Sequence, residues 1–201
     1  KLSPASLCRK YHDEEPHTRH VAGLAADLFR RARRRLGMPA GDGPLLEAAA
    51  RLHDTGFAGH PAAHAARGAR IVMAHAIRGL SPRERLMVAA AISLHSRHSP
   101  GRRNNPWLAR LSPERRRRAL AIAAILRVAD ALDHSHCQDA SIRSVSARKS
   151  AIDVKVRCSA YPGNIFYAGE KADLWRQVLP VPVRLTASRG SIRAPGFSRM
   201  L

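Results

Sequence analysis

The chain has 201 residues, of which 45% are hydrophobic and 25% charged, a balance typical of a globular protein with one good core. Its 35 lysines and arginines against 15 aspartates and glutamates give a formal net charge of +20, which favours polyanionic partners, although a genome-wide arginine bias explains the charge equally well. Three cysteines without CxxC spacing argue against a disulfide framework, and the absence of a signal peptide or of an apolar run long enough to span a membrane predicts a cytoplasmic protein.

Six amphipathic or apolar segments predict a mainly helical N-terminal part. The clearest stripe, Val21, Leu24 and Leu28, has the i, i+3, i+7 spacing of a buried helix face, and Gly37 is placed to end that helix. Extending the stripe one turn backwards reaches His17, so we expect His17 to point inward. The expected helices span about residues 3–13, 16–36, 44–54, 61–77, 82–95 and 113–133.

The pattern changes after about Cys137, where strands are expected. Ile152, Val154 and Val156 alternate with charged residues, which predicts a half-buried strand. A weaker strand over 142–147 could pair with it as a hairpin, and a helix near 170–178 and a strand over 181–185 should follow. We therefore predict a mainly α protein in which residues 1–138 form a helical domain, 139–187 a small α+β subdomain and 188–201 a disordered tail.

The chemistry of the chain is expected at His53 and Asp54, which end an apolar run. An imidazole and a carboxylate side by side at a buried helix end are costly unless they are paired or bind a cation. Both are good ligands for a divalent ion. For this dipeptide alone a surface pair at a helix terminus is the simpler interpretation, so a metal site needs support from other inward-facing residues.

That support comes from further histidines and aspartates on other predicted helices. Taken singly, each has a simpler explanation, such as a core histidine, a surface histidine, a helix C-cap or an ion pair. Asp133 also continues the apolar stripe of its helix better than Asp130, so periodicity does not choose between them. Together, however, side chains from five helices or helix ends favour an internal metal site. The candidate ligands are His17, His53, Asp54, His64, His95 and Asp130.

The order of these residues resembles the HD superfamily of metal-dependent phosphohydrolases. The similar segments are HTRHVAGLA (17–25), AAARLHDTG (48–56) and ILRVADALD (125–133). The resemblance implies an HD-type helical bundle and selects Asp130 over Asp133. The implied ligands of the first metal are His17, His53, Asp54 and Asp130. Superfamily members with two metals add histidines in segments similar to HAARGARIV (64–72) and AISLH (91–95), which nominates His64 and His95.

A closer similarity, over about residues 1–187, is to the C-terminal HD-type domain of exopolyphosphatase and guanosine pentaphosphate phosphatase (Ppx/GppA) proteins. It is carried by HTRHVAGLAADLF (17–29), GHPAAH (59–64), ILRVADALDHSHCQ (125–138) and EKADLW (170–175). Proteins of that family ordinarily carry an N-terminal pair of actin-like ATPase-type domains, which hold their phosphatase site. The resemblance thus implies either a stand-alone HD protein or a domain of a longer one.

These patterns predict a divalent-metal-dependent phosphohydrolase that activates a water on one or two ions such as manganese, magnesium or iron. His53 and Asp54 are the expected catalytic residues, with Asp54 orienting or deprotonating the water. Because arginine suits phosphate, Arg97 and Arg127 join His98 as candidate substrate-binding residues. A solvated basic surface explains the loop arginines equally well, and an ion pair with Asp130 or Asp133 explains Arg127 somewhat better.

The substrate could be a phosphomonoester, a phosphoanhydride or a nucleotide. The alternative function is a non-catalytic module that binds polyphosphate or nucleotides, or that forms a homodimer. Nucleic acid ranks last as a partner, because aromatic residues make up only 4% of the chain and no recognition motif is present.

Overall fold

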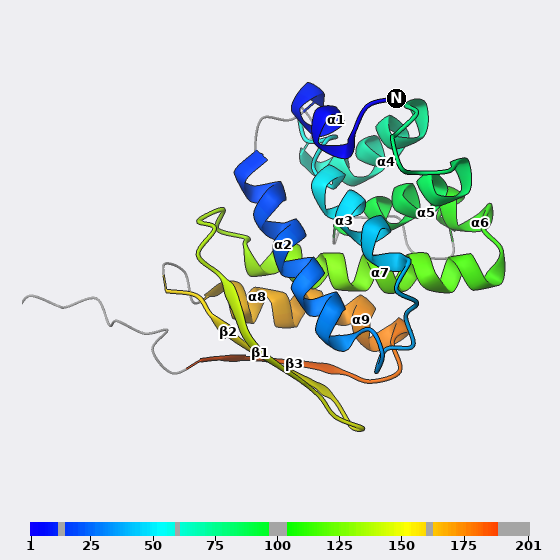
Figure 1. The fold of residues 1–201 in the computed structure, drawn as a ribbon. Coiled ribbons are helices and arrows are strands. Elements are labelled where there is room, and N and C mark those ends of the chain that lie inside the picture. The colour runs from blue at the N-terminus through cyan, green and yellow to red at the C-terminus, as the bar shows by residue number, and fades with distance from the viewer. Residues whose placement is uncertain (12–14, 59–60, 97–103, 160–162, 189–201) are drawn as a thin grey trace, which may run out of the picture.

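Alanine- and leucine-rich stretches form helices around a long central helix, and a small sheet lies on one flank (Figure 1). The computed structural model describes residues 1–11, 15–58, 61–96, 104–159 and 163–188. The helices are α1 (Pro4–Tyr11), α2 (Glu15–Ala32), α3 (Asp42–Leu52), the 3-10 turn η1 (Pro61–Ala63), α4 (His64–Ala74), α5 (Pro82–Ser93), α6 (Pro106–Ala109), α7 (Pro113–Leu132), α8 (Gly163–Lys171) and α9 (Asp173–Val178). The strands are β1 (Ser141–Ala147), β2 (Ile152–Arg157) and β3 (Val183–Ala187).

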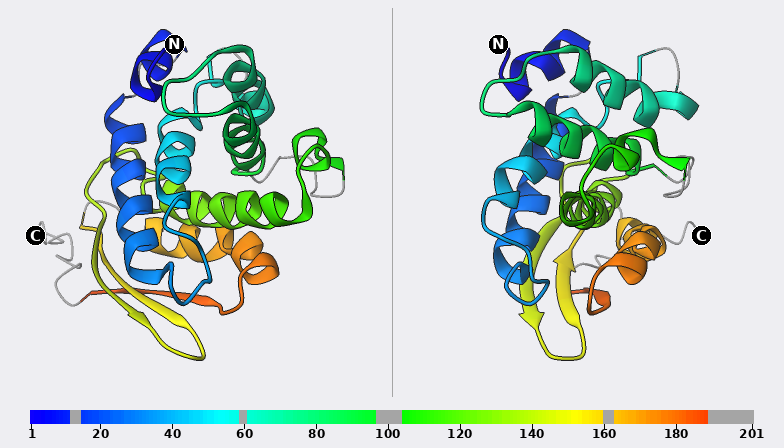
Figure 2. Two further views of the ribbon diagram at one scale, coloured as in Figure 1. Left: turned by 45° about the vertical axis from the view of Figure 1, so that its right-hand side comes forward. Right: turned by 90° about the vertical axis from the view of Figure 1, so that its right-hand side faces the viewer.

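Helix α7 organises the bundle. It begins at Ser112, whose side chain accepts a hydrogen bond from the Arg115 backbone N–H, and a proline follows at the first helical position. Its later turns are buried around most of the circumference, from Ala121 to Ala129. Helices α2, α3 and α5 pack against one side of α7 and helices α8 and α9 against the other (Figure 2). Because α7 contacts both groups, its C-terminal turns can meet side chains from most of the fold.

The sheet has the order β1-β2-β3. Strands β1 and β2 form the expected antiparallel hairpin, while β3 pairs in parallel with β2 after the chain has crossed over through α8 and α9. Ile152, Val154 and Val156 on β2 are buried, as their alternation predicts. The prediction of a mainly helical protein with a small C-terminal α+β part is therefore confirmed.

Several predicted bounds are wrong in detail. Helix α2 ends at Ala32, and a turn carries the chain to Gly37, whose φ of +66° suits glycine. The helix expected from 61 to 77 is a 3-10 turn followed by α4. The helix expected near 170–178 is two helices, α8 and α9, and the short α6 was not predicted. The expected tail beyond residue 188 lies outside the described residues. Among the described helices, none is long and apolar enough to cross a membrane.

Candidate metal centre

Side chains from five parts of the fold meet beside the C-terminal turns of α7. His17 lies in the first turn of α2, His53 and Asp54 directly follow α3, and His64 begins α4. His95 follows α5, and Asp130 lies near the end of α7. The expectation that His17 points inward is confirmed, because only 2% of its surface is exposed. All six predicted ligands are thus brought to one place by elements that are far apart in the sequence.

Three of the imidazole rings are fixed by their Nδ1 atoms. Nδ1 of His53 lies 2.8 Å from the Ala50 carbonyl oxygen, and Nδ1 of His95 lies 2.7 Å from that of Ile92. Nδ1 of His17 lies 2.8 Å from Oδ2 of Asp133. Each of these oxygens accepts the Nδ1 proton, so Nε2 is the nitrogen that the neutral ring offers to a metal. This is the arrangement that orients histidines toward a metal.

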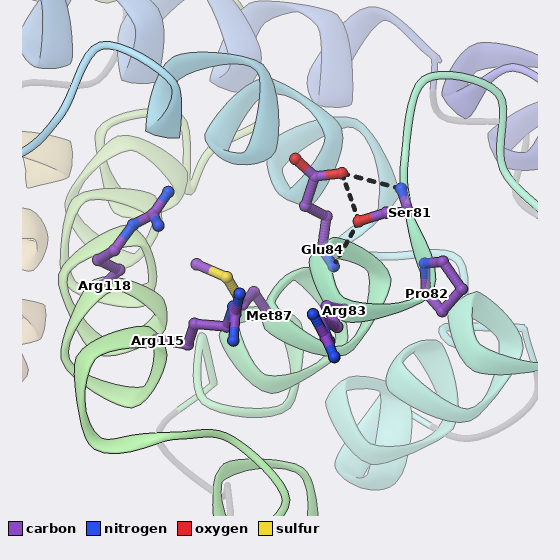
Figure 3. A pocket seen from close by; sticks show the side chains of 7 residues that line it. All are labelled: Ser81, Pro82, Arg83, Glu84, Met87, Arg115 and Arg118. Atoms are coloured by element: carbon purple, nitrogen blue, oxygen red, sulfur yellow. Dashed lines mark hydrogen bonds between the residues drawn. The ribbon is translucent and has the colours of Figure 1, made fainter.

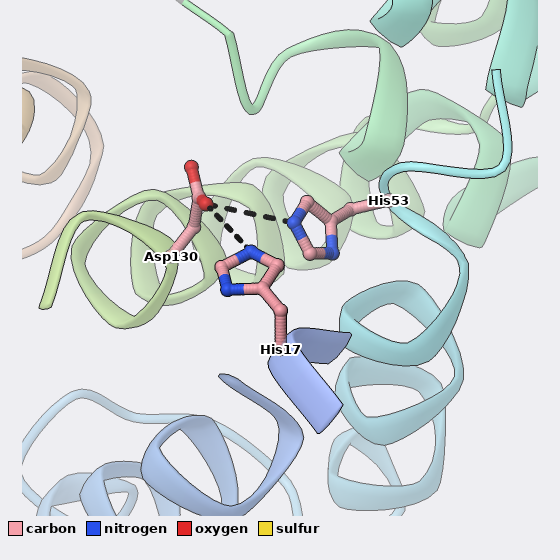
Figure 4. A group of neighbouring side chains, drawn as sticks. All are labelled: His17, His53 and Asp130. Carbon is pink, nitrogen blue, oxygen red and sulfur yellow. Dashed lines mark ion pairs between the residues drawn. The ribbon is translucent and has the colours of Figure 1, made fainter. Parts of the chain in front are cut away.

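The Nε2 atoms converge on the two carboxylates. Asp54 Oδ2 lies 3.7 Å from His17 Nε2 and 3.2 Å from His53 Nε2, while Asp54 Oδ1 lies 3.7 Å from Nε2 of both His64 and His95. Asp130 Oδ1 completes the first group, at 3.6 Å from His17 Nε2 and 3.5 Å from His53 Nε2 (Figure 4). Asp54 therefore stands between two sets of imidazoles, with one oxygen directed at each.

Two buried atoms of this cluster need a partner. Nε2 of His17 and Nε2 of His53 are buried, and neither has a hydrogen-bond partner in the described part of the chain. Leaving a buried polar atom unsatisfied is costly. The donor atoms of His17, His53 and Asp130, and those of His53, Asp54 and His95, lie within 4.8 Å of one another, close enough to share an ion. A divalent cation would satisfy both orphaned nitrogens.

The electrostatics of the cluster also favour a cation. Burial raises the pKa of Asp54, but the His53 and His95 rings together outweigh burial and hold this pKa well below its usual range. The pKa of Asp130 is likewise well below its usual range, because the neighbouring Lys171 ammonium and the two histidines outweigh burial. Burial lowers the pKa of His53, yet Asp54 and Asp130 together raise it well above its ordinary value. The ionised carboxylates of Asp54 and Asp130 thus stabilise positive charge at this buried position.

A glycine allows the supporting helices to approach closely. A Cβ at Gly68 would lie 3.3 Å from the Ile92 side chain, 3.4 Å from the His53 carbonyl oxygen and 3.4 Å from Thr55 Oγ1. Gly68 thus lets α4 pack directly against α5 and the turn that carries His53. Close packing therefore explains why a glycine lies inside this helix.

Asp133 has a different role from Asp130, a distinction that periodicity did not make. Its Oδ2 accepts from His17 Nδ1, and its Oδ1 accepts at 2.8 Å from the Gln138 backbone N–H. Asp130 faces the Nε2 atoms, whereas Asp133 orients one of the rings from behind. The stripe on which Asp133 lies was the signal for its burial.

The predicted substrate-binding residues lie differently. Arg127 is buried, with Nη2 at 2.8 Å from Asp173 Oδ1 on α9 and Nη1 at 3.5 Å from the Leu94 carbonyl oxygen. The ion pair expected with Asp130 or Asp133 is thus replaced by one with Asp173, and Asp130 instead accepts from Lys171 Nζ at 2.6 Å. Arg97 and His98 lie outside the described residues.

The model of one family, Ppx/GppA phosphatase domain III, matches residues 1–161. The chain belongs to this family. A search of curated proteins found no match. All six cluster residues of this Ppx/GppA domain lie inside the matched range, while α8, α9 and β3 follow it. The chain is accordingly related to exopolyphosphatases.

Proposed function

We propose that this domain is a divalent-metal-dependent phosphohydrolase of the HD type. The observation that carries the proposal is the position of Asp54, whose two oxygens face two separate groups of histidine Nε2 atoms. A carboxylate that bridges two cation sites is a recurrent part of two-metal phosphatases and nucleases. The proposed substrate is a phosphomonoester, a phosphoanhydride or a nucleotide, and the proposed catalytic residues are His53 and Asp54.

The donor set fits a divalent ion. Atoms that ligate one zinc-like ion at about 2.0–2.2 Å must lie within about 4.4 Å of each other. The separations of 3.2–3.7 Å between Asp54 oxygens and the four Nε2 atoms meet this condition. The first group would comprise His17, His53, Asp54 and Asp130, and the second Asp54, His64 and His95. When bound, such an ion would supply Lewis acidity, which polarises phosphoryl oxygens and lowers the pKa of water.

The residues of the chain supply orientation. Asp54 is only 8% exposed and its pKa is held low by His53 and His95 against the effect of burial, so it stays a carboxylate that accepts a hydrogen bond from the attacking water. The Nδ1 anchors keep the rings of His17, His53 and His95 in place without solvent rearrangement.

The test is phosphate release in the presence of manganese across a panel of phosphomonoesters, nucleotides and polyphosphate. In His53→Asn, the amide can still donate to the Ala50 carbonyl oxygen while Nε2 is lost. We expect the release rate to fall about 100-fold or more, because a metal ligand is removed. His75→Asn is a matched control, because His75 Nδ1 has the same kind of bond, 2.9 Å from the Ile71 carbonyl oxygen, outside the cluster. Equal rates in wild type and His53→Asn would refute the assignment.

A second candidate function is non-catalytic binding of polyphosphate or nucleotides. One hollow on the surface, lined by arginines, favours it. It has a volume of about 450 Å³ and lies at the N-terminal ends of α5 and α7, away from the histidine cluster. Three arginines, Arg83, Arg115 and Arg118, line it beside Glu84 (Figure 3). Arg118 also donates to the buried Asp42, whereas within the described residues the guanidinium groups of Arg83 and Arg115 have no ion pair.

Polyphosphate binding at this hollow is testable with Arg83→Gln combined with Arg115→Gln. We expect the affinity for polyphosphate to fall about tenfold and its salt dependence to weaken, because two phosphate contacts are lost. Arg143→Gln with Arg157→Gln removes the same charge from the exposed face of the sheet and serves as the control. Tight binding without phosphate release in manganese-replete protein would select the module over the enzyme. An equal loss of polyphosphate affinity in both double variants would mean that polyphosphate binds to basic surface in general rather than to this hollow.

A further inference from the structure

The wall of the cluster next to Asp130 is built by the C-terminal part of the chain. Lys171, the last residue of α8, places Nζ 2.6 Å from Asp130 Oδ2, and its side chain is only 12% exposed. Asp130 thus divides its oxygens, with Oδ1 directed at the Nε2 atoms of His17 and His53 and Oδ2 at the ammonium. The Lys171 ammonium is therefore bonded directly to one of the proposed metal ligands, Asp130.

This ammonium has unused capacity for binding. It carries three N–H donors, and within the described residues only Asp130 accepts from it. The two remaining donors can bind a further acceptor, and an anion is the acceptor that best matches the charge of the ammonium. The structural role of holding Asp130 requires only one of the three donors.

The turn after α7 forms the rest of this wall and has an uncommon backbone. His136 and Gln138 have φ values of +54° and +52°, which non-glycine residues seldom adopt. Asp133 holds the turn, because its side chain accepts from the Gln138 N–H and its carbonyl oxygen accepts from the His136 N–H, both at 2.8 Å. Such strain tends to persist where it positions a functional group.

The group that this turn positions is an imidazole. The His136 ring stacks on His17 with centroids 3.9 Å apart and an angle of 1° between the planes, and the residue remains exposed. His134, two residues earlier, stacks on Tyr167 of α8 with centroids 4.0 Å apart. His136 and Asp130 both lie against His17, so the turn brings the imidazole to the side of the cluster where Lys171 holds Asp130.

We propose that Lys171 and His136 bind the phosphate group of the substrate at the mouth of the histidine-aspartate cluster. This inference rests on the proposed function and names a binding site for it, formed partly by α8, which follows the residues matched by the family model. The ligand class is a phosphate dianion, which takes a direct hydrogen bond from Nζ and one from the exposed imidazole. The ammonium stabilises charge that develops on the phosphoryl oxygens.

The experiment titrates inorganic phosphate into the manganese-loaded full chain by calorimetry. Lys171→Met should weaken phosphate binding about tenfold or more, since a charge-assisted hydrogen bond is lost, and His136→Ala should weaken it less. The affinity for manganese should fall less than the affinity for phosphate in both variants, because neither side chain is itself a proposed metal ligand. Lys155→Met, at an exposed position on β2, is the matched control. Lys171→Gln, which is shorter and still polar, replaces the methionine variant if that variant does not fold.

Phosphate affinity within twofold of wild type in Lys171→Met would overturn the inference. An equal loss of manganese affinity would also overturn it, because Lys171 would then only position Asp130. Both results differ from failure of the proposed function, in which the wild-type protein releases no phosphate from any substrate of the panel. Phosphate binding that depends on Lys171 would still stand in that case, as an anion site of a non-catalytic module.

Discussion

Asp54→Asn should abolish tight binding of divalent metal while leaving the helical bundle folded. The substitution preserves the shape of the side chain but removes the negative charge that faces both groups of Nε2 atoms at 3.2–3.7 Å. It also leaves an amide N–H₂, which cannot ligate a cation, directed at one of the two groups. Because one carboxylate serves both groups, we expect both sites to be affected, with an affinity loss of about 100-fold or more.

The measurement is a manganese titration of chelator-treated protein by calorimetry, with circular dichroism to check the fold. Asp27→Asn is the control, since Asp27 lies on α2 outside the cluster and pairs with Arg30 and Arg31. Unchanged stoichiometry and affinity in Asp54→Asn would show that Asp54 does not bridge two sites. Loss of binding in the Asp27 variant as well would mean that general charge, rather than the cluster, attracts the metal.

Gly56→Ala should destabilise the protein strongly and displace the turn that carries His53 and Asp54. A Cβ at this position would lie 2.2 Å from the His64 carbonyl oxygen, 2.5 Å from the Gly68 nitrogen and 3.0 Å from the Arg67 Cβ. Two of these atoms belong to the backbone of α4, which cannot move aside without shifting His64. We expect a loss of about 3 kcal/mol of stability and a fall in Tm of about 6–12 °C.

Gly23→Ala is the matched control for this change. Gly23 lies in the exposed interior of α2, and its added Cβ would meet nothing within 4 Å. Alanine should therefore stabilise α2 by about 1 kcal/mol, the opposite sign from Gly56→Ala. Thermal unfolding of both variants gives the comparison. A Tm for Gly56→Ala equal to that of the wild type would mean that the turn and α4 are not in the contact that the structure places between them.

Local sequence patterns predicted the helices and strands themselves better than the boundaries between them. The i, i+3, i+7 stripe of α2 and the alternation in β2 identified both the type of element and its buried face. The boundary between α8 and α9 was missed because Ala172, which separates them, is itself a strong helix former. Both helices pack against α7, and packing between segments that are distant in the sequence is not visible in a local pattern.

The sequence predicted which histidines and aspartates form the cluster, but not which residues pair with Arg127 and Asp130. Adjacency of His53 and Asp54, and the inward stripe that reaches His17, could be read from spacing. Arg127 pairs with Asp173, which lies 46 residues further along the chain. Asp130 pairs with Lys171, which lies 41 residues further along. Spacing along one helix gives no information on such pairs, so the sequence assigns no role to Lys171.

Anomalous scattering from a crystal of the manganese-soaked protein is the most direct test of the central claim, which is that these side chains bind a divalent metal. We predict one peak among the side chains of His17, His53, Asp54 and Asp130, and a second peak among Asp54, His64 and His95. Both peaks should lie within about 2.5 Å of the Nε2 atoms. A map with no manganese peak at the cluster, from protein soaked at saturating manganese and neutral pH, would contradict the claim.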